Sequence, residues 1–416
     1  MERERPGTDV VITGIGVVTP IGTGVDAFWD GLMSGRSGAG PLTAFDASDI
    51  PVRIACQVDD FNASDYMDAR DVPRSDRFTH MGVAAATLGL KDAGLEDADL
   101  GESAGVIVGS GIGGLTTIED EHSAFLASGP RRVSPFMVPK MMPNAAAAAI
   151  AMRFGYHGPN FAPSSACATG AHAIGEAYRY IRDGEADVMI AGGTEAALTR
   201  LAVSAFARMG ALSKRNDDPA AASRPFEKDR DGFVFGEGAG VLVLESREHA
   251  EGRGARIIAE VAGYGATADA FHVAQPDPDG KGAVMAMLRA LKGAGLKVDD
   301  VDYLNAHGTS TPVNDRVETA AIKKAFGVEA KRIAVSSTKS QTGHLLGAAG
   351  GVEAAVCALV IDRDRIPGTI NLTEADPDCD LDYVADGPRD QHVDVCMSNS
   401  FGFGGQNACL VIRRAR

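Results

Sequence analysis

The sequence of 416 residues lacks several features that would assign it to common classes of protein. Its six cysteines never form a C-x-x-C pair, so their spacing indicates neither a zinc site nor a disulfide framework. It has no apolar run of about 20 residues, the length needed to span a bilayer. A strand pattern follows the charged N-terminal residues directly, without the apolar core of a signal peptide. We therefore expect a cytoplasmic protein with no membrane contact.

Positive charge is also scarce. The chain has 40 lysines and arginines against 56 aspartates and glutamates, which gives a formal net charge of -16. Nucleic acids and anionic membrane surfaces are bound by concentrated positive charge, so this balance argues against both as main partners. An acidic protein partner would need a local basic patch on this chain.

Apolar runs typical of buried strands alternate with helical patterns along almost the whole chain. Examples are "DVVITGIGVV", "ADVMIAGG" and "GAGVLVLES" early in the chain, and "VDYLNAHG" and "RIAVSSTKS" later. Such alternation is typical of sheets that are covered on both faces by helices. The fold class predicted from it is α/β. Many of the 50 glycines lie at the ends of these strands, where the chain must turn tightly.

The chain divides near "EHAEGRGARIIAE" into an N-terminal part, residues 1–256, and a C-terminal part, residues 257–416. Each part holds one strand-to-helix corner of similar design. The first reads "SSACATGAHAIGEAYRY" and contains Cys167, and the second reads "SSTKSQTGHLLGAAG" and contains His344. The similarity lies in the pattern and is not an identity repeat. It predicts two related halves that meet face to face.

Cys167 opens an apolar stripe at helical spacing, which continues through residues 171, 174, 178 and 181. This spacing places Cys167 in the first turn of a helix. Free backbone N–H groups there carry partial positive charge, which favours a thiolate over a thiol. A lone cysteine on such a stripe is, however, more often a small buried residue. The stretch alone does not decide between the two interpretations.

Two histidines lie at similar corners. His307, in "NAHGTSTPVND", ends a strand and precedes a turn, and His344 lies beside glycines at a helix start. Strand ends followed by such loops are where α/β proteins gather their chemistry. Either histidine alone is more often structural. Together with the cysteine corner they form a recurrent set for nucleophilic catalysis.

The motifs "SSACATG", "NAHGTSTPVND", "SSTKSQTGHLLGAAG" and "SNSFGFGGQN" occur in an order and spacing that resemble the β-ketoacyl-acyl carrier protein synthases. These are condensing enzymes of the thiolase superfamily, and the resemblance is strongest to the elongating type II branch. It implies a thiolase-like fold, in which two pseudo-symmetric halves form a five-layered α-β-α-β-α sandwich. It also implies a homodimer that acts on acyl and malonyl groups carried by acyl carrier protein. No cofactor of its own is implied, because 4'-phosphopantetheine belongs to the carrier.

The resemblance assigns roles to individual residues. Cys167 would take the acyl chain as a thioester. His307 and His344 would bind the malonyl thioester carbonyl, promote loss of carbon dioxide and stabilise the enolate, an effect worth roughly 2.7 to 4 kcal/mol for one well-placed donor. The backbone N–H groups of Cys167 and Phe403 would form a second oxyanion site. Phe403 matches a gating phenylalanine; its neighbours in the gating loop are Phe401, Gly402 and Gly404.

Further residues match supporting positions of the family. Lys339 and Glu318 would form an ion pair that organises the histidines, and Asp315 and Glu353 also fall on family positions. Thr309 and Thr311 would bind the pantetheine arm. The acyl pocket would be lined by Ile112 and closed by Phe136 from the partner subunit. No metal is expected, apart from a possible monovalent cation at Asn305, Glu353, Ser398 and Asn399. The basic candidates for carrier docking are Arg70, Arg74, Arg77, Arg208, Lys214 and Arg215.

Two positions depart from the family pattern: Gln406 replaces a usual threonine, and Gly210 replaces a usual basic residue. "GSGIGG" fits a dinucleotide fingerprint, but a lone match is weak and no fitting acidic residue completes it. Three alternatives remain at this point. A thiolase would need a second cysteine where "SFGFGG" has phenylalanine. A ketosynthase of a polyketide or specialised fatty-acid pathway would use the same chemistry. A silent chain-length-factor subunit would lack the nucleophile.

Overall fold

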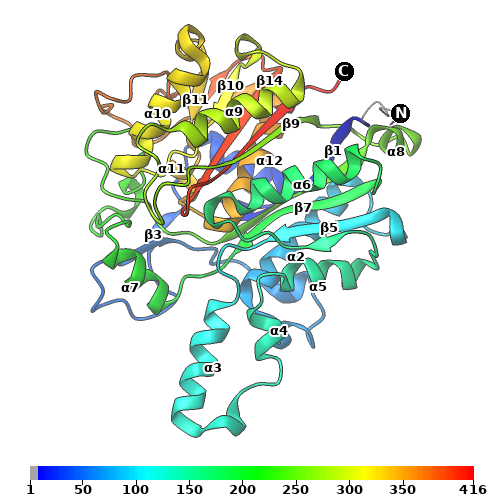
Figure 1. Cartoon of the computed structure of the whole chain (residues 1–416). Helices are drawn as coiled ribbons and strands as arrows, with labels where there is room; N and C mark the ends of the chain where they lie inside the picture. The colour runs from blue at the N-terminus through cyan, green and yellow to red at the C-terminus, as the bar shows by residue number, and fades with distance from the viewer. Residues whose placement is uncertain (1–7) are drawn as a thin grey trace.

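The computed structural model describes residues 8–416, and its centre is an 11-stranded sheet (Figure 1). Its strands run in the order β11-β10-β14-β15-β9-β1-β8-β7-β5-β6, and β2 pairs with β1. Their bounds are β1 Val10–Thr19, β2 Gly22–Thr23, β5 Ala104–Gly109, β6 Asn160–Phe161, β7 Val188–Glu195, β8 Gly238–Ser246, β9 Ala259–Ala268, β10 Tyr303–Asn305, β11 Ala334–Ser336, β14 Val395–Gly402 and β15 Gln406–Arg413.

The sheet consists of two five-stranded units with the same topology. In β1-β8-β7-β5-β6 the successive pairings are antiparallel, antiparallel, parallel and parallel. The unit β9-β15-β14-β10-β11 repeats this series. The two units join through a short antiparallel pairing of β1 with β9, at residues 10–12 and 259–261. The predicted pseudo-symmetry of the two halves is therefore present in the strands.

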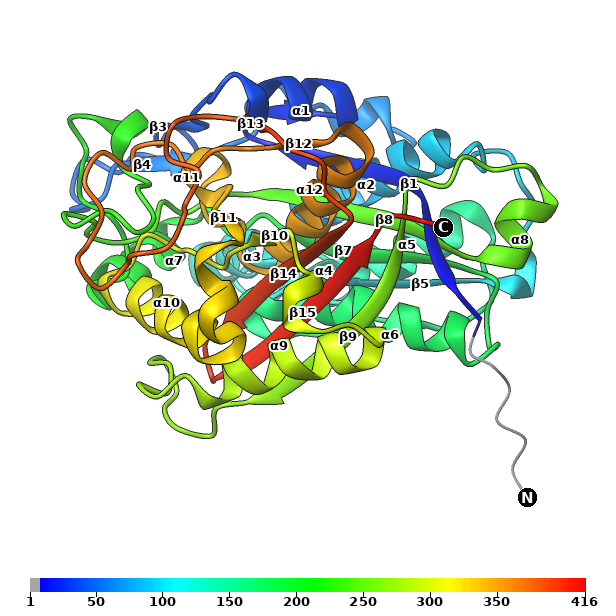
Figure 2. The same cartoon turned by 90° about the horizontal axis from the view of Figure 1, so that it is seen from above.

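Helices cover both units and also separate them (Figure 2). α2 and α5 pack on the outer face of the first unit, and α9 and α10 cover the second. α6 and α12 lie between the two units and contact both. Their bounds are α2 Arg77–Ala93, α5 Ala145–Phe154, α6 Thr169–Arg182, α9 Lys281–Ala294, α10 Pro312–Phe326 and α12 Ala349–Arg363. The predicted five-layered α-β-α-β-α order is confirmed.

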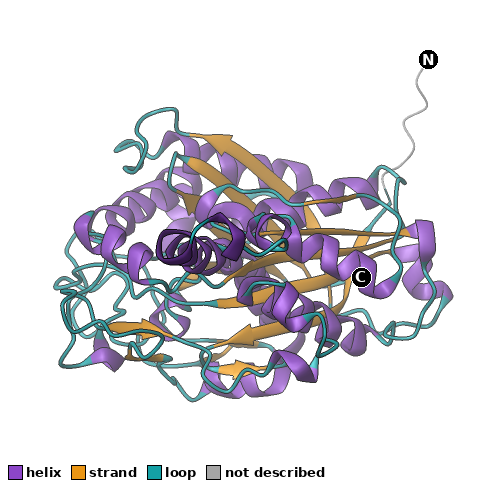
Figure 3. Cartoon of the chain, turned by 90° about the horizontal axis from the view of Figure 1, so that it is seen from below, coloured by secondary structure: helices purple, strands orange, loops and turns teal. Residues whose placement is uncertain are grey.

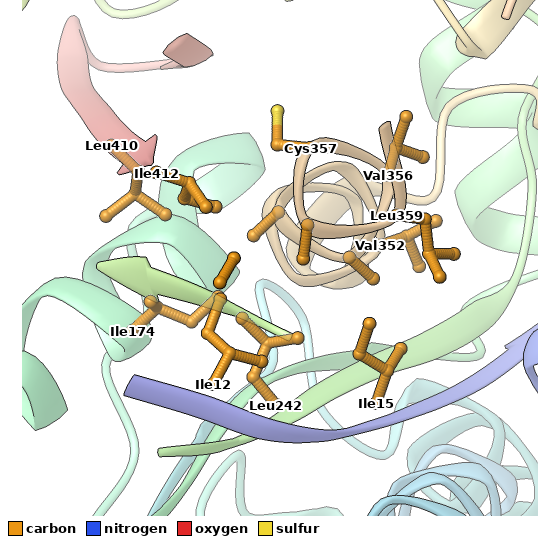
Figure 4. Close-up of a cluster of buried hydrophobic side chains, with 14 of the residues drawn as sticks. Ile12, Ile15, Ile174, Leu242, Val352, Val356, Cys357, Leu359, Leu410 and Ile412 are labelled. Atoms are coloured by element: carbon orange, nitrogen blue, oxygen red, sulfur yellow. The ribbon is translucent and has the colours of Figure 1, made fainter. Parts of the chain in front are cut away.

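The composition of α12 explains its central position. Every residue from 349 to 361 is buried, and all of them except Glu353 are apolar or glycine, so this helix is stable only when it is surrounded by protein. Figure 4 shows Val352, Val356 and Leu359 on this helix, with Ile12 and Leu242 on the strands below it. The amphipathic stripe predicted for α6 faces the same core.

Shorter elements lie around this sandwich, where loops connect the helices and strands (Figure 3). α3 and α4 form an arm, residues 115–141, that projects from the body (Figure 1). Within residues 8–416, no helix has both the length and the apolar character that crossing a bilayer requires. The remaining helices and strands are α1 Val25–Met33, β3 Ala39–Pro41, β4 Ile54–Cys56, α3 Leu115–Ser128, α4 Met137–Met141, α7 Arg200–Arg208, α8 Arg247–Gly252, α11 Lys339–Thr342, β12 Arg365–Ile366 and β13 Arg389–Asp390. The proposed boundary at residue 256 falls between α8 and β9.

The first turns of α6 and α12 touch through glycine. A Cβ on Gly170 would lie 2.6 Å from the backbone nitrogen of Gly351 and 3.1 Å from the carbonyl oxygen of Gly347. These distances leave no room for a side chain. The glycine therefore lets the two helices, and the corners that precede them, approach closely.

We expect Gly170→Ala to lower the free energy of unfolding by about 1–3 kcal/mol, because the added methyl group overpacks the helix contact. The measurement is the urea midpoint followed by circular dichroism. Gly293→Ala on α9 is the matched control, since the nearest heavy atom to a Cβ there is 3.9 Å away. It should be neutral or stabilising by up to about 1 kcal/mol. Equal midpoints for the two variants would contradict the close contact.

Candidate active site

Cys167 lies in a short 3₁₀ turn, Ala166–Ala168, directly before α6. The sequence predicted it in the first helical turn, but the α-helix begins two residues later, at Thr169. Ala166 has a φ of +49°, a left-handed conformation that turns the chain sharply at the cysteine. The Thr169 hydroxyl accepts from the Ser165 N–H at 2.9 Å and donates to the Ala166 carbonyl at 2.8 Å. The strained corner is thus held from both sides.

His344 lies before the corresponding turn of the second half, Leu346–Ala348, where Leu346 has a φ of +47°. Its backbone is fixed by a segment of the first half. The His344 N–H donates to the Val234 carbonyl at 2.8 Å, and the His344 carbonyl accepts from the Gly236 N–H at 3.0 Å. Both halves therefore determine where this imidazole lies.

The structure brings the three predicted residues together. The sulfur of Cys167 and one ring nitrogen each of His307 and His344 lie within 4.8 Å of one another. The Nε2 atom of His344 is 3.0 Å from the sulfur, and the two imidazole rings are 5.4 Å apart at 84°. None of the three residues is more than 5% exposed. A nucleophile and two polar ring nitrogens thus face one small volume.

A cavity of about 400 Å³ opens over these groups. Residues of both halves line it, and the gating loop forms part of its wall. They include Cys167, Met209, Phe233, His307, Thr309, Thr311, His344, Leu346, Phe401, Gly402, Phe403 and Gly404. Phe233, which the sequence analysis missed, contacts the His344 ring edge to face at 5.2 Å. No signal in its motif distinguishes it from a core phenylalanine.

Both histidines are neutral. Burial lowers the pKa of His307 and of His344 well below the usual value, and the positive charge of Lys339 lowers both further. The Nδ1 atom of each ring has no hydrogen-bond partner among residues 8–416. Since a buried N–H without a partner is rarer than an unpartnered acceptor, we assign the proton to Nε2 in both rings. Two N–H donors then point into the cavity.

Cys167 rests as a thiol, which corrects the expectation of a favoured thiolate. Burial raises the pKa of the Cys167 thiol to about 12, and this effect outweighs the charge of Lys339 and the Phe403 N–H, which lower it. The free-energy cost of desolvating a thiolate here exceeds the stabilisation that the partial positive charge at the start of a helix provides. The proton must therefore leave the sulfur during the attack itself.

Lys339 pairs with Glu353, and both side chains are at most 3% exposed. The expected pair of Lys339 with Glu318 is wrong. Glu318 instead accepts hydrogen bonds from the backbone N–H groups of His307 at 2.8 Å and Gly308 at 2.7 Å. It fixes the backbone of His307, while Lys339 supplies charge near the cysteine. Burial raises the pKa of Glu353 to about 7, although Lys339 opposes the rise.

Four buried side-chain oxygens of the expected cation site have no hydrogen-bond partner among the described residues. They are Asn305 Oδ1, Glu353 Oε2, Ser398 Oγ and Asn399 Oδ1. Asn305 and Ser398 are paired in the register of β10 and β14, so these two are neighbours. Oxygen-only ligands suit hard cations. Asn305 and Ser398 therefore suit a monovalent cation, whereas the Asn399 amide donates to Glu318 at 3.2 Å and lies against Met287.

The Cys167, His307 and His344 donors could also bind a soft metal ion. Metal-binding histidines, however, almost always donate their second ring nitrogen to an acceptor, which fixes the ring. Neither Nδ1 atom has such an acceptor within residues 8–416. The arrangement is therefore better suited to a nucleophile with two hydrogen-bond donors than to a dedicated metal site.

The gating loop approaches the backbone of the cysteine corner. A Cβ on Gly402 would lie 2.7 Å from the Ser165 carbonyl oxygen and 3.3 Å from the Cys167 nitrogen, so only glycine fits. Gly404, with a φ of +84°, turns the hairpin, and its N–H donates to the Val273 carbonyl at 2.9 Å. Gln406, which replaces the usual threonine of the family, pairs with Gly402 in the regular register of β14 and β15. It therefore does not disturb the cysteine.

The two pantetheine candidates lie at the cavity wall, and their hydroxyls are 2.9 Å apart. Arg230 holds their loop. Its guanidinium donates to the carbonyls of Thr311 and Pro312, each at 3.0 Å, and pairs with buried Asp315 at 3.3 Å. The sequence analysis missed Arg230 because an arginine within "EKDRDGF" resembles a surface charge. Asp315 thus acts through Arg230 on the loop.

Ile112 lies in the loop after β5 and packs against the apolar cluster that contains Cys167 and Leu346. Phe136 lies on the arm, outside the cavity of its own chain, and is 40% exposed. The Arg74 guanidinium covers the Phe136 ring at 5.3 Å.

The six basic candidates differ in their surroundings. Arg77 is unsuitable for docking, because its guanidinium is held by both carboxylate oxygens of Glu237, at 2.8 and 2.9 Å, and by the Val58 carbonyl. Arg70 and Arg74 line a separate cavity of about 550 Å³ on the arm side. Arg208, Lys214 and Arg215 flank residues 209–211 at the active-site cavity.

We expect alkylation of Cys167 by iodoacetamide to accelerate about tenfold per pH unit between pH 7 and 9.5, because the thiolate fraction keeps growing below a pKa of about 12. Intact-mass spectrometry follows the reaction. Cys167→Ala is the control for the other five cysteines, all of them buried. A rate that levels off below pH 8 would show that the thiol is already ionised there.

Comparisons with known proteins agree with this geometry. The N-terminal domain model of β-ketoacyl synthases matches residues 7–250, and the C-terminal domain model matches residues 258–373. The chain is 52% identical, over 100% of its length and 99% of the relative, to 3-oxoacyl-[acyl-carrier-protein] synthase 2 of Synechocystis sp. (strain PCC 6803).

Two solved structures extend the likeness to the whole fold. The ishigamide ketosynthase/chain length factor aligns with a TM-score of 0.93 at 38% identity, covering 99% of this chain and 100% of the other. A type II polyketide ketosynthase, solved in complex with its acyl-carrier protein, aligns with a TM-score of 0.91 at 34% identity, covering 98% and 100%. The motifs, the fold and these matches together show that the chain belongs to the β-ketoacyl synthase family.

Proposed function

We propose that Cys167, His307 and His344 carry out the decarboxylating condensation of an acyl chain with malonyl-acyl carrier protein, which gives 3-oxoacyl-acyl carrier protein in fatty-acid elongation. The observation that supports these roles most strongly is the neutral state of both imidazoles beside a buried thiol. Neutral Nε2–H groups can donate to an enolate oxygen without forming an ion pair with the cysteine. This separates acyl transfer from decarboxylation within one cavity.

In the first half-reaction the sulfur of Cys167 attacks the thioester carbonyl of the acyl-carrier. The backbone N–H groups of Cys167 and Phe403 stabilise the oxyanion. The carbon–sulfur bond to pantetheine then breaks, and the carrier leaves as a free thiol with the proton that the cysteine has lost. The buried thioester that remains carries no charge.

In the second half-reaction the malonyl thioester oxygen accepts hydrogen bonds from His307 and His344. The bond to the malonyl carboxylate breaks, carbon dioxide leaves, and its electron pair forms the enolate. Each well-placed donor is worth roughly 2.7 to 4 kcal/mol to such an oxyanion. The enolate carbon attacks the acyl-cysteine carbonyl, and the Cys167 thiolate leaves and takes up a proton. The reaction uses no cofactor of the enzyme, since the phosphopantetheine belongs to the carrier.

The comparisons favour fatty-acid elongation over a polyketide pathway. Identity reaches 52% and 47% with 3-oxoacyl-[acyl-carrier-protein] synthases 2 of Synechocystis and Coxiella burnetii, against 34% with the polyketide ketosynthase. The presence of Cys167 and both histidines argues against a silent chain-length-factor subunit. Phe403 stands where a thiolase would need its second cysteine, which argues against that activity.

The expected partner is acyl carrier protein, bound at the cavity mouth. Arg208 and Lys214 are exposed there and would meet the acidic carrier surface, while the chain as a whole has a formal charge of -16. These two side chains lie on either side of residues 209–211 and would supply local positive charge against the general repulsion. Gly210 lies between them and leaves the mouth open.

A second copy of the chain is the occupant we propose for the arm side of the molecule. The edge strand β6 is exposed, and exposed edges favour strand pairing. Large apolar side chains are exposed on the arm, on α5 and at the residue that follows the arm, and an exposed apolar patch marks an interaction site. They are Ile118, Phe125, Leu126, Phe136, Val138, Met142 and Met152. In such a homodimer, Phe136 would reach the acyl pocket of the partner.

We expect light scattering to give twice the 43.1 kDa mass of one chain at micromolar concentration. Leu126→Glu on the arm should shift the protein toward monomer, because it places a charge in the apolar contact. Val328→Glu, at a position that is 86% exposed and away from the arm, is the matched control and should remain dimeric. A wild-type monomer would contradict the shared pocket.

We expect two active-site variants to lose different partial reactions. Cys167→Ala should abolish condensation while some malonyl decarboxylation persists, since both histidines remain. His344→Ala should lower malonyl decarboxylation roughly 10²–10³-fold, the effect of removing one oxyanion donor, while Cys167 still accepts the acyl chain. Carbon dioxide release and the intact mass of the acyl-enzyme measure the two steps. Elongation by Cys167→Ala, or lost acyl loading with normal decarboxylation in His344→Ala, would refute these roles.

A further inference from the structure

A fully buried carboxylate that the proposed mechanism does not use lies close to the cysteine. Glu195 ends β7 and is 0% exposed, and its charge acts on the Cys167 thiol. Each of its oxygens accepts two hydrogen bonds. The donors are the Ser110 hydroxyl at 2.7 Å and the backbone N–H groups of Gly111 at 2.8 Å, Gly347 at 3.1 Å and Ile112 at 3.3 Å.

The pseudo-symmetry of the fold explains this position. β7 and β14 are corresponding strands of eight residues, which end at Glu195 and Gly402. Cys167 and Gly347 are the middle residues of the two corresponding 3₁₀ turns. Gly402 lies against the Cys167 nitrogen without a side chain, whereas the Glu195 carboxylate accepts the Gly347 N–H. The same corner is open in one half and filled by a carboxylate in the other.

We propose that Glu195 is a positioning residue that sets which acyl chains Cys167 accepts. Its carboxylate is an anion that belongs to the protein and occupies a second anion pocket. This pocket corresponds, in the other half of the fold, to the oxyanion site at Cys167. The proposal rests on the acyl transfer proposed above. It concerns a residue that touches neither substrate nor sulfur and acts through the two loops that it joins.

The first of these loops forms an acyl-facing wall. Glu195 holds the backbone of Gly111 and Ile112, and the Ile112 side chain packs in the apolar cluster with Cys167 and Leu346. The Ser110 hydroxyl that donates to Glu195 also accepts the Gly113 N–H at 2.8 Å. Residues 110–113 therefore depend on this one carboxylate for their position.

The second loop carries Leu346, which lines the cavity, directly before Gly347. A Cβ on Gly347 would lie 2.4 Å from the Gly111 nitrogen and 2.8 Å from Glu195 Oε2. The two loops are thus packed around the carboxylate without free space. Any loss of its hydrogen bonds moves the Ile112 and Leu346 walls relative to the sulfur.

The chemistry of the pocket selects an anion. Three of the four donors are backbone N–H groups, which cannot accept a hydrogen bond. A glutamine would turn its own N–H₂ group toward one pair of these donors. Burial raises the pKa of Glu195, but its four hydrogen bonds oppose the rise and favour the charged form.

The test is the selectivity of acyl loading. Wild type, Glu195→Gln and Glu195→Asp are incubated with a ladder of acyl-carrier substrates of increasing chain length, and acylation of Cys167 is followed by intact mass. We expect the ratio of loading rates between the best and the poorest chain to fall about tenfold or more in Glu195→Gln, because buried donors lose their acceptor. Glu245→Gln is the matched control: Glu245 is also 0% exposed, but it is held by Arg253, His249 and Thr13. It should keep the wild-type ratio even if its melting temperature falls.

Rescue by a small anion distinguishes the proposed role of the carboxylate from a merely structural role of the side chain. In Glu195→Ala, sodium formate at 50 mM should restore the selectivity ratio and raise the melting temperature, while sodium chloride at equal ionic strength should not. An unchanged ratio in Glu195→Gln, or equal effects of formate and chloride, would overturn the proposal. If wild-type Cys167 takes no acyl chain, the proposed function fails. If it does, and the Glu195 variants load the ladder as wild type does, this inference alone fails.

Discussion

The contact between the first turns of α6 and α12 is the constraint on which the site depends. At Gly170 these helices approach so closely that a Cβ would meet the backbone of Gly351. The two 3₁₀ turns before the helices are thereby held close together; one contains Cys167, and the other begins two residues after His344. A nucleophile from one half and a proton donor from the other can share a cavity only because no side chain separates the helices. Close packing of this kind also transmits any change of volume directly to the site.

Burial at this contact determines the charges of the reacting groups. The thiol keeps its proton and both imidazoles stay neutral, because desolvation dominates the pKa of each. The buried cation Lys339 is paired with Glu353, and Glu318 accepts hydrogen bonds from two backbone N–H groups and from the Asn399 amide. The site therefore holds its dipoles ready for an oxyanion that exists only during reaction. Preorganised donors of this type need no reorganisation when the charge appears.

The two halves share a topology but have diverged at one equivalent position. Gly402 leaves the cysteine corner open to a substrate, while Glu195 fills the corresponding corner at Gly347. In this duplicated fold the corner at Cys167 can thus serve as the reactive site, while the corresponding corner at Gly347 serves as a rigid support. The open corner needs glycines, which allow the gating loop to approach; the filled one needs a carboxylate, which joins loops of both halves.

Features that depend on local patterns of residues could be predicted from the amino-acid sequence. The alternation of strands and helices predicted the α/β class, and the paired corners predicted two related halves. The spaced motifs placed Cys167, His307 and His344 among the residues to examine. Which groups come into contact could be read from the three-dimensional fold alone. It replaced the expected Lys339–Glu318 pair with Lys339–Glu353, removed Arg77 from the docking candidates, kept the cysteine as a thiol, and revealed Arg230 and Glu195. Each of these depends on desolvation or on a partner more than ten residues away in the chain, and neither is encoded in a local spacing.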